Sequence, residues 1–150
     1  MNKTTPAQII STTLPAGKYI VGDPCYSMGD HENWISWLER ADYRNQKTIL
    51  EAKTPNGIAA GVSTMHGDGV YRGNDGNLYG VDAGLIGVVP LLDARDLNEV
   101  IGGKLGYVKE FDHDFAMSRD EDGVIHIGDL QIPTGGYEDD LDAYFSEENY

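Results

Sequence analysis

The chain has 150 residues, with 11 basic against 25 acidic side chains and a net charge of −14. A chain of this length is about one domain and buries roughly 70% of its unfolded surface, so it can fold without a metal or a disulfide. The acidic excess should repel nucleic acid and anionic membranes, which disfavours direct binding to either. The same charge could serve solubility alone, or it could imitate a nucleic-acid backbone.

The cysteine content and the first residues indicate a compartment. Cys25 is the sole cysteine, which excludes an internal disulfide and any all-cysteine zinc site within one chain, and a reducing environment is the natural inference. Residues 1–17 hold only the pair Ile9-Ile10 where a signal peptide needs a longer apolar run. No apolar run is long enough for a membrane span. We therefore expect a cytoplasmic protein without a membrane partner.

The first predicted elements are a strand, a turn and a helix. Residues 18–21 form an apolar run that predicts a strand, and the turn Gly22-Asp23-Pro24 ends it, because proline cannot continue a central strand. Residues 31–41 show the best helical pattern of the chain, with apolar side chains at i, i+3, i+4 and i+7. These side chains are Trp34, Trp37, Leu38 and Ala41. The two tryptophans should face the core.

From Lys47 onward, short apolar or β-favouring runs alternate with turn-forming residues. The runs span residues 48–52, 57–64, 69–71, 78–81, 85–92, 105–111, 114–118 and 124–127. Residues 93–100 could form a short helix between two of them. The pattern predicts a mainly β, α+β fold, in which an antiparallel meander of about eight short strands curls into a small barrel or sandwich.

Residues 137–150 differ in composition from the rest of the chain. They carry six acidic side chains and no basic one. Leu141, Tyr144 and Phe145 fall at helical spacing within this segment, which predicts either a short docked helix or a mobile acidic tail that engages a partner. No linker or internal repeat divides what precedes it, so residues 1–136 are predicted to form a single globular domain.

Three motifs place an aspartate inside or beside glycine-rich turns. They are Gly22-Asp23-Pro24-Cys25-Tyr26, His66-Gly67-Asp68-Gly69 and Gly80-Val81-Asp82-Ala83-Gly84. An aspartate in such a turn can be held near a ligand, or it can bond to the backbone and close the turn. Turn closure is the more ordinary explanation for each aspartate taken singly.

The second and third motifs should meet in space. Residues 73–77 predict a hairpin turn centred on Asp75, and Asp68 and Asp82 each lie seven residues from that centre. Asp23 joins them if the first turn lies at the same end of the sheet. The candidate ligand-binding residues of this region are Asp23, Cys25, Tyr26, His66, Asp68, Tyr71 and Asp82.

The chemistry available to this region is limited. One histidine with two or three carboxylates suits a divalent metal or a general acid–base pair, so His66, Asp68 and Asp82 are candidate metal ligands. Cys25 follows a proline among negative charges, which opposes thiolate formation and favours a structural role.

The acidic stretch 118–129 only superficially resembles a calcium loop, and a hairpin turn is expected there. The sequence identifies no cofactor and no complete catalytic constellation.

The motifs, taken in order, resemble a known group of proteins. Residues 16–26 (AGKYIVGDPCY), 67–71 (GDGVY) and 80–87 (GVDAGLIG) are similar to an uncharacterised family of small phage and prophage proteins. The similarity spans residues 16–134 and leaves the acidic C-terminal segment outside. It implies an accessory factor that acts on host physiology or defence in the cytoplasm of the host cell. It supplies no reaction and no catalytic residues.

Three functions follow from these patterns. The favoured one is a non-catalytic phage-type accessory protein that binds a host protein or a small ligand through the glycine–aspartate region, in a role such as counter-defence. The first alternative is a small metal-assisted hydrolase, in which the same carboxylates hold a divalent metal and His66 relays a proton. The second alternative is an acidic nucleic-acid mimic that binds a basic host protein.

Overall fold

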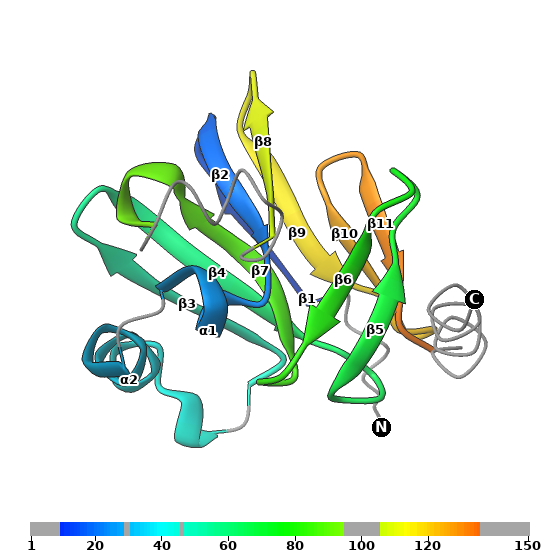
Figure 1. Cartoon of the computed structure of the whole chain (residues 1–150), viewed down its shortest axis with the longest axis horizontal. Coiled ribbons are helices and arrows are strands. Elements are labelled where there is room, and N and C mark those ends of the chain that lie inside the picture. The colour runs from blue at the N-terminus through cyan, green and yellow to red at the C-terminus, as the bar shows by residue number, and fades with distance from the viewer. Residues whose placement is uncertain (1–9, 29–30, 46, 95–105, 136–150) are drawn as a thin grey trace, which may run out of the picture.

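The computed structural model describes residues 10–28, 31–45, 47–94 and 106–135 (Figure 1). These ranges hold eleven strands, all paired in antiparallel fashion, and two α-helices. The first strands are β1 (Ile10–Leu14), β2 (Gly17–Gly22), β3 (Ile49–Thr54), β4 (Gly57–Ser63), β5 (Gly69–Arg72) and β6 (Leu78–Val81). The later strands are β7 (Leu85–Pro90), β8 (Tyr107–Phe111), β9 (Phe115–Arg119), β10 (Val124–Ile127) and β11 (Leu130–Pro133). The helices are α1 (Pro24–Met28) and α2 (His31–Arg40), with 3-10 turns η1 (Tyr43–Asn45) and η2 (Leu91–Asp93).

The strands form three sheets around one core. The largest sheet has the strand order β3-β4-β7-β2-β8, the second has the order β1-β9-β10-β11, and the β5–β6 hairpin forms the third. Buried side chains from all three sheets, such as Val88, Met117 and Tyr71, belong to one cluster. The tip of the β5–β6 hairpin is fastened to β11, because the backbone N–H of Asn74 donates to the carbonyl oxygen of Gln131 at 2.9 Å.

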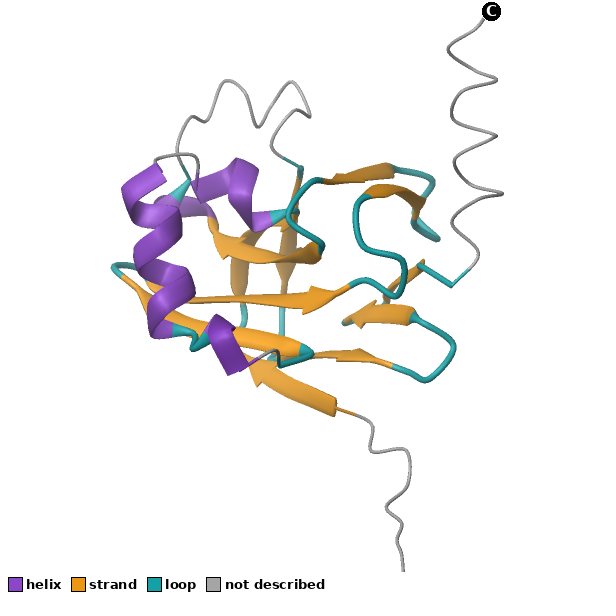
Figure 2. Ribbon diagram, turned by 90° about the horizontal axis from the view of Figure 1, so that it is seen from below, coloured by secondary structure: helices purple, strands orange, loops and turns teal. Residues whose placement is uncertain are grey.

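The five-stranded sheet is covered on both faces. Along β7, Ile86 and Val88 point into the core shared by the three sheets, while Leu85 and Val89 pack in a second cluster with α1 and α2. Figure 2 shows the helices gathered on one side of the strands. All six residues of β7 are therefore buried, which explains why this run is continuously apolar instead of alternating.

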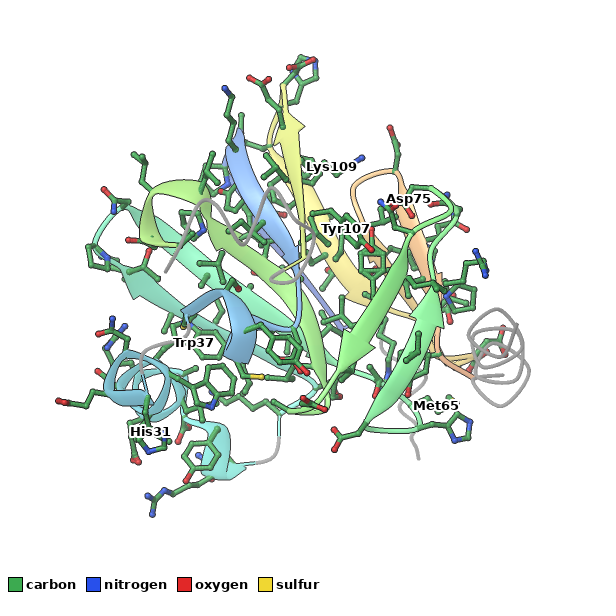
Figure 3. All side chains as sticks on the ribbon, in the orientation of Figure 1. His31, Trp37, Met65, Asp75, Tyr107 and Lys109 are labelled. Atoms are coloured by element: carbon green, nitrogen blue, oxygen red, sulfur yellow. The ribbon has the colours of Figure 1, made fainter. Side chains whose placement is uncertain are left out.

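Helix α2 packs on the outer face of the five-stranded sheet. Trp37 is 0% exposed and lies between α2 and the sheet (Figure 3), and Trp34 is partly buried beside it. The two indole rings are stacked, with centroids 5.6 Å apart. The prediction of an amphipathic helix near residues 31–41 with its tryptophans toward the core is confirmed.

A row of glycines crosses three strands of this sheet. Gly87 of β7 pairs with Gly61 of β4 on one side and with Gly22 of β2 on the other. A Cβ atom on Gly87 would lie only 1.9 Å from the carbonyl oxygen of Ala60, and one on Gly61 would lie 3.5 Å from Cγ of Pro24. The glycines therefore let the strands approach each other closely and let α1 rest on the sheet.

The predicted fold class is confirmed as mainly β, α+β and antiparallel. The described strands form no closed barrel, because the two larger sheets keep separate edges, and the arrangement is a small sandwich. Strands β1 and β11 and helix α1 were not predicted. From residue 95 onward the predicted helix 93–100 lies outside the described residues, and so does the acidic segment 137–150. In the described ranges no helix is both long and apolar enough to cross a membrane.

Candidate functional site

The carboxylate of Asp23 joins the first and third glycine–aspartate motifs. Asp23 is 1% exposed. Its Oδ2 accepts hydrogen bonds from the backbone N–H groups of Asp82 and Ala83, each at 2.7 Å, and its Oδ1 accepts one from the backbone N–H of Cys25 at 3.0 Å. The first motif therefore does lie against the third, and three backbone donors occupy the Asp23 carboxylate. We call this arrangement the Asp23 clamp.

Tyr26 adds a side-chain link across the same two motifs. Its hydroxyl donates a hydrogen bond to Oδ2 of Asp82. Burial of the phenol and this hydrogen bond raise the pKa of Tyr26 well above its usual range. The phenol is therefore neutral at physiological pH and acts as a hydrogen-bond donor.

Cys25 lies half-buried beside the Asp23 clamp. Burial of the thiol raises its pKa far above the usual value, and the negative charge of Asp23 adds to the shift. The carboxylates of Asp82 and Asp68 act in the same direction. The thiol is therefore protonated at neutral pH, which opposes a nucleophilic role.

The β5–β6 hairpin brings the second motif to the third. Gly69 of β5 pairs with Val81 of β6, so Asp68 and Asp82 adjoin the same end of the hairpin, as the count from Asp75 predicted. Asp75 itself lies at the opposite end of the hairpin (Figure 3), where its Oδ2 accepts a hydrogen bond from the hydroxyl of Tyr79 at 2.6 Å. Asp68 and Asp82 are both exposed.

His66 and Tyr71 have separate surroundings. Nε2 of His66 lies 2.9 Å from the carbonyl oxygen of Gly135. The ring of Tyr71 is fully buried in the core, and its hydroxyl donates to the carbonyl oxygen of Gly67 at 2.8 Å. Among the residues that the structure describes, no three histidine, cysteine, aspartate or glutamate side chains are grouped so that they could hold a metal ion. The candidate metal ligands His66, Asp68 and Asp82 thus form no such group.

The acidic stretch 118–129 forms the turn between β9 and β10. Oδ1 of Asp120 accepts hydrogen bonds from the backbone N–H groups of Asp122 and Val124, each at 3.0 Å. The bond from Val124 contributes most to lowering the pKa of Asp120. The hairpin turn expected for this stretch is confirmed.

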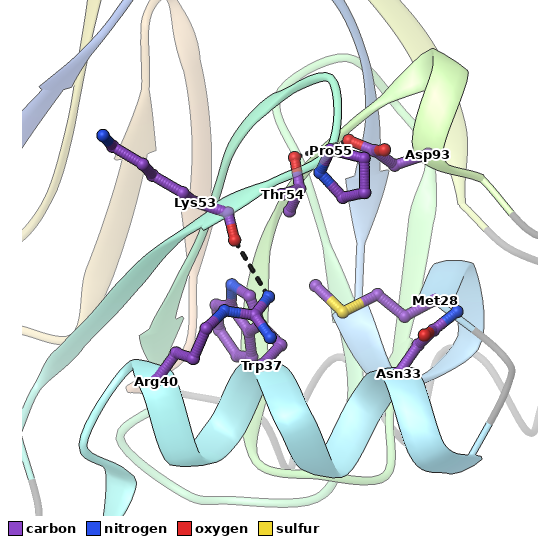
Figure 4. Close-up of a pocket in the computed structure, with 8 residues that line it drawn as sticks. All are labelled: Met28, Asn33, Trp37, Arg40, Lys53, Thr54, Pro55 and Asp93. Carbon is purple, nitrogen blue, oxygen red and sulfur yellow. Dashed lines mark hydrogen bonds between the residues drawn. The ribbon is translucent and has the colours of Figure 1, made fainter.

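A pocket of about 390 Å³ lies beside α2 and takes one lining residue from α1, the helix that begins within the first glycine–aspartate motif (Figure 4). It is lined by residues of α1, α2, η2 and the hairpin between β3 and β4, namely Met28, Asn33, Trp37, Arg40, Lys53, Thr54, Pro55 and Asp93. Its volume falls in the range of roughly 300 to 1,000 Å³ that is usual for small-molecule sites. The pocket has no direct signature in the sequence, because four separate elements enclose it.

The indole of Trp37, a pocket-lining residue that is 0% exposed, carries an unpartnered donor. Its Nε1 is the one buried side-chain nitrogen or oxygen in the described part of the chain without a hydrogen-bond partner. Leaving a buried donor unsatisfied costs about 1–3 kcal/mol, so native structures rarely contain one. Because Trp37 is 0% exposed, this donor does not reach the open space of the pocket.

Arg40 is the neighbour of Trp37 in the pocket, three residues further along α2. One end of its guanidinium donates to the backbone carbonyl of Lys53 at 2.9 Å, and the other donates to Oγ of Ser36. Both acceptors are uncharged. Within the described ranges, no carboxylate is paired with the guanidinium, whose positive charge is left at the pocket.

The acidic residue of the pocket is already held by other side chains. Oδ2 of Asp93 accepts a hydrogen bond from Oγ1 of Thr54 at 2.5 Å, and its Oδ1 accepts one from Nδ2 of Asn56 at 2.7 Å. In Figure 4, Asp93 and Arg40 lie at opposite ends of the group, and the side chain of Lys53 extends away from the others. Among the residues that the structure describes, Arg40 therefore forms the cationic end of the pocket.

No family model, curated protein or solved structure matches this chain. The resemblance to small phage and prophage proteins stays a prediction. For the pocket, the one signal present in the sequence was the spacing of Trp37 and Arg40, which puts an aromatic donor and a cation on the same helix face.

Proposed function

We propose that this chain is a non-catalytic, phage-type accessory protein that binds a small ligand in the pocket beside α2. The observation that carries the proposal is a pocket of ligand size at which, among the described residues, the guanidinium of Arg40 donates only to uncharged acceptors. The pocket lining combines apolar side chains with polar and charged ones, and small-molecule sites likewise pair apolar walls with placed polar groups. In a phage-type protein the ligand would come from the host, in keeping with a role in counter-defence.

The glycine–aspartate region has a supporting part in this proposal. Asp23 is occupied by three backbone donors, and the raised pKa values of Cys25 and Tyr26 keep both groups protonated at neutral pH. Groups in these states hold a turn together more readily than they attack a substrate. Because α1 begins at Pro24 and ends at Met28, the Asp23 clamp fixes the element that supplies one wall of the pocket.

A fragment screen by NMR tests the proposal. The tryptophan indole N–H signals of the ¹⁵N-labelled protein are recorded with a library of small polar and apolar compounds, and the signal of Trp37 is identified from the variant Trp34→Phe. We expect at least one compound to shift the Trp37 signal with saturable, one-to-one binding. The compound should be recovered unchanged after prolonged incubation, because binding is the whole function.

Two variants of α2 make the test specific for the pocket. Asn33→Trp places a large ring at a position that lines the pocket, and it should abolish the binding of that compound. Ile35→Trp is the matched control, because Ile35 is 41% exposed and does not line the pocket, and it should bind normally. The proposal is wrong if no compound shifts the Trp37 signal, or if the wild-type protein converts the bound compound into a product.

A further inference from the structure

We propose that the edge of β3 is a self-association surface, along which β3 of a second copy of this chain pairs in antiparallel fashion. β3 stands at one end of the strand order β3-β4-β7-β2-β8, so one side of it has no neighbouring strand in the described part of the chain (Figure 1). An open strand edge is a template for another strand. This surface acts whether or not the pocket beside α2 binds a ligand.

The register of the sheet shows which backbone groups of β3 face the open side. The backbone N–H of Ser63 donates to the carbonyl oxygen of Thr48 at 2.9 Å, in the same register as the β3–β4 ladder. Hydrogen-bonded pairs alternate along an antiparallel ladder, so the even-numbered residues of β3 bond to β4. The odd-numbered residues therefore direct their N–H and C=O groups to the open side. These residues are Ile49, Glu51 and Lys53.

One of the outward groups is engaged by a neighbouring helix. The carbonyl oxygen of Lys53 accepts a hydrogen bond from the guanidinium of Arg40 at 2.9 Å. This bond agrees with the outward direction of the Lys53 carbonyl. Arg40 reaches the oxygen from α2, and a carbonyl oxygen has two lone pairs, so it can accept from a second donor as well.

The side chains at this edge carry opposite charges. Glu51 and Lys53 are both exposed, and they lie on the same face of β3 because they are two residues apart. The carboxylate of Glu51 accepts a hydrogen bond from the hydroxyl of Thr12, which is uncharged. Among the residues described, neither Glu51 nor Lys53 has an ion-pair partner. Both charges are therefore available to a second chain.

A two-fold axis through Ala52 matches these charges. In that register Glu51 lies opposite the partner's Lys53, and Lys53 lies opposite the partner's Glu51. Both members of each pair direct their backbone groups to the interface, so each pair can exchange two hydrogen bonds. An axis through Glu51 or Lys53 would instead place that residue opposite itself, and like charges directly opposite each other are destabilising.

The other edges of the two larger sheets offer no such match. The edge of β11 is covered, because the backbone N–H of Gln131 donates to Oδ1 of Asn74 at 3.0 Å. β1 carries no charged residue. In β8, Lys109 and Glu110 are adjacent, so they point to opposite faces and cannot meet each other across a two-fold axis. A charge without a match keeps an edge unpaired, whereas the charges of β3 match those of its own copy.

Sedimentation velocity over a series of protein concentrations, at physiological ionic strength, tests the assignment. We expect a reversible monomer–dimer equilibrium, because one strand pair is a small interface and the net charge of −14 on each chain opposes association. Glu51→Lys and Lys53→Glu should each weaken dimerisation by at least about tenfold, because each variant puts two pairs of like charges opposite one another.

An equimolar mixture of these two variants separates local pairing from general charge. In the mixed dimer every lysine at the interface faces a glutamate again, so the mixture should dimerise about as strongly as the wild type. Glu51→Lys lowers the net negative charge, so a general electrostatic effect would strengthen its association. Lys18→Glu is the matched control, because it makes the same change as Lys53→Glu at an exposed position of β2, and it should dimerise nearly as the wild type does.

Amide hydrogen exchange of the wild type gives a second measurement that needs no variant. The N–H groups of Glu51 and Lys53 point to the open edge, so their exchange should slow as the protein concentration rises. The N–H of Ala52 bonds to β4, and its exchange should not depend on concentration. This comparison decides the assignment even if a variant fails to fold.

Several results would overturn the assignment. A wild type that stays monomeric at every concentration would do so, even if the edge of β3 pairs with a strand of another protein. A dimer that both charge reversals leave intact, or a mixture of the two variants that stays monomeric, would also overturn it. Unchanged exchange at Glu51 and Lys53 in a dimer would place the interface elsewhere.

Discussion

Asp23 shows what a single residue in a predicted turn can do. For this aspartate the sequence allowed either ligand binding or turn closure. In the structure its carboxylate closes its own turn and also binds the backbone of a distant loop. One oxygen bonds the N–H of Cys25 in its own turn, while the other bonds Asp82 and Ala83 some 59 and 60 residues away. The local bond is an ordinary property of aspartate in a turn and could be predicted. The distant donors could not, because no residue of the first motif specifies which loop faces it.

The Asp23 clamp predicts a large effect of a nearly isosteric change. We expect Asp23→Asn to lower the free energy of unfolding by about 2–3 kcal/mol, because the amide NH₂ would face a backbone N–H group at whichever oxygen position it takes. Urea unfolding followed by tryptophan fluorescence measures this. Asp68→Asn removes the same charge from an exposed side chain and should change stability by no more than about 0.5 kcal/mol. Equal effects of the two substitutions would contradict the clamp.

At the level of the elements, the glycine row decides how α1 sits on the sheet. The strands β2, β4 and β7 were predicted from their apolar residues, and their centres proved correct. Helix α1 was missed because its five residues are too few to show helical periodicity, and because the proline at its first position also suits a turn. The glycine pairing was missed for another reason. It depends on the register of strands that are far apart in the chain.

The glycine row predicts that one added methyl group breaks the sheet. We expect Gly87→Ala to destabilise the protein by about 3 kcal/mol, because its Cβ would meet the Ala60 carbonyl oxygen at 1.9 Å and the strands would have to separate. The measurement is the midpoint of thermal unfolding.

Two other glycines provide the comparison for this change. Gly80→Ala is the control, because Gly80 also lies in a strand and no atom would lie within 4 Å of the new Cβ. Gly61→Ala should have an intermediate effect, since its nearest contacts would be ordinary ones at 3.5 Å, and it serves if Gly87→Ala does not fold. A Gly87→Ala protein as stable as Gly80→Ala would contradict this prediction, because it would show that the strands accommodate a Cβ atom at residue 87.

On the scale of the whole molecule, two cores share the strands β4 and β7. Ala60 and Ile86 face the core between the sheets, whereas Ala59 and Leu85 face the helices. The class and the antiparallel strands followed from alternation and turn residues. The choice between barrel and sandwich depended on pairings such as β1 with β9, which join distant parts of the chain and leave no local pattern. The pocket could not be predicted from the sequence for the same reason.

The shared strands predict that the two cores unfold together. We expect Ile125→Ala, in the core between the sheets, to cost about 2–5 kcal/mol. Tryptophan fluorescence, which reports on α2, and circular dichroism, which reports on the strands, should give the same loss, because β4 and β7 contribute to both cores. Gln131→Ala, at an exposed position of the neighbouring strand, is the control. Separate transitions for the two probes would contradict a single globular domain over residues 1–136.

The Asp23 clamp also closes a long loop of the chain. Between Asp23 and Asp82 the chain makes an excursion of 59 residues and returns to the same carboxylate. Seven of the eight residues that line the pocket lie inside this excursion, namely Met28, Asn33, Trp37, Arg40, Lys53, Thr54 and Pro55. The entropy lost on closing a loop grows only slowly with its length, by about 0.6 kcal/mol for each doubling. A few hydrogen bonds at the base are therefore enough to hold nearly all of the pocket lining as one closed segment of the polypeptide.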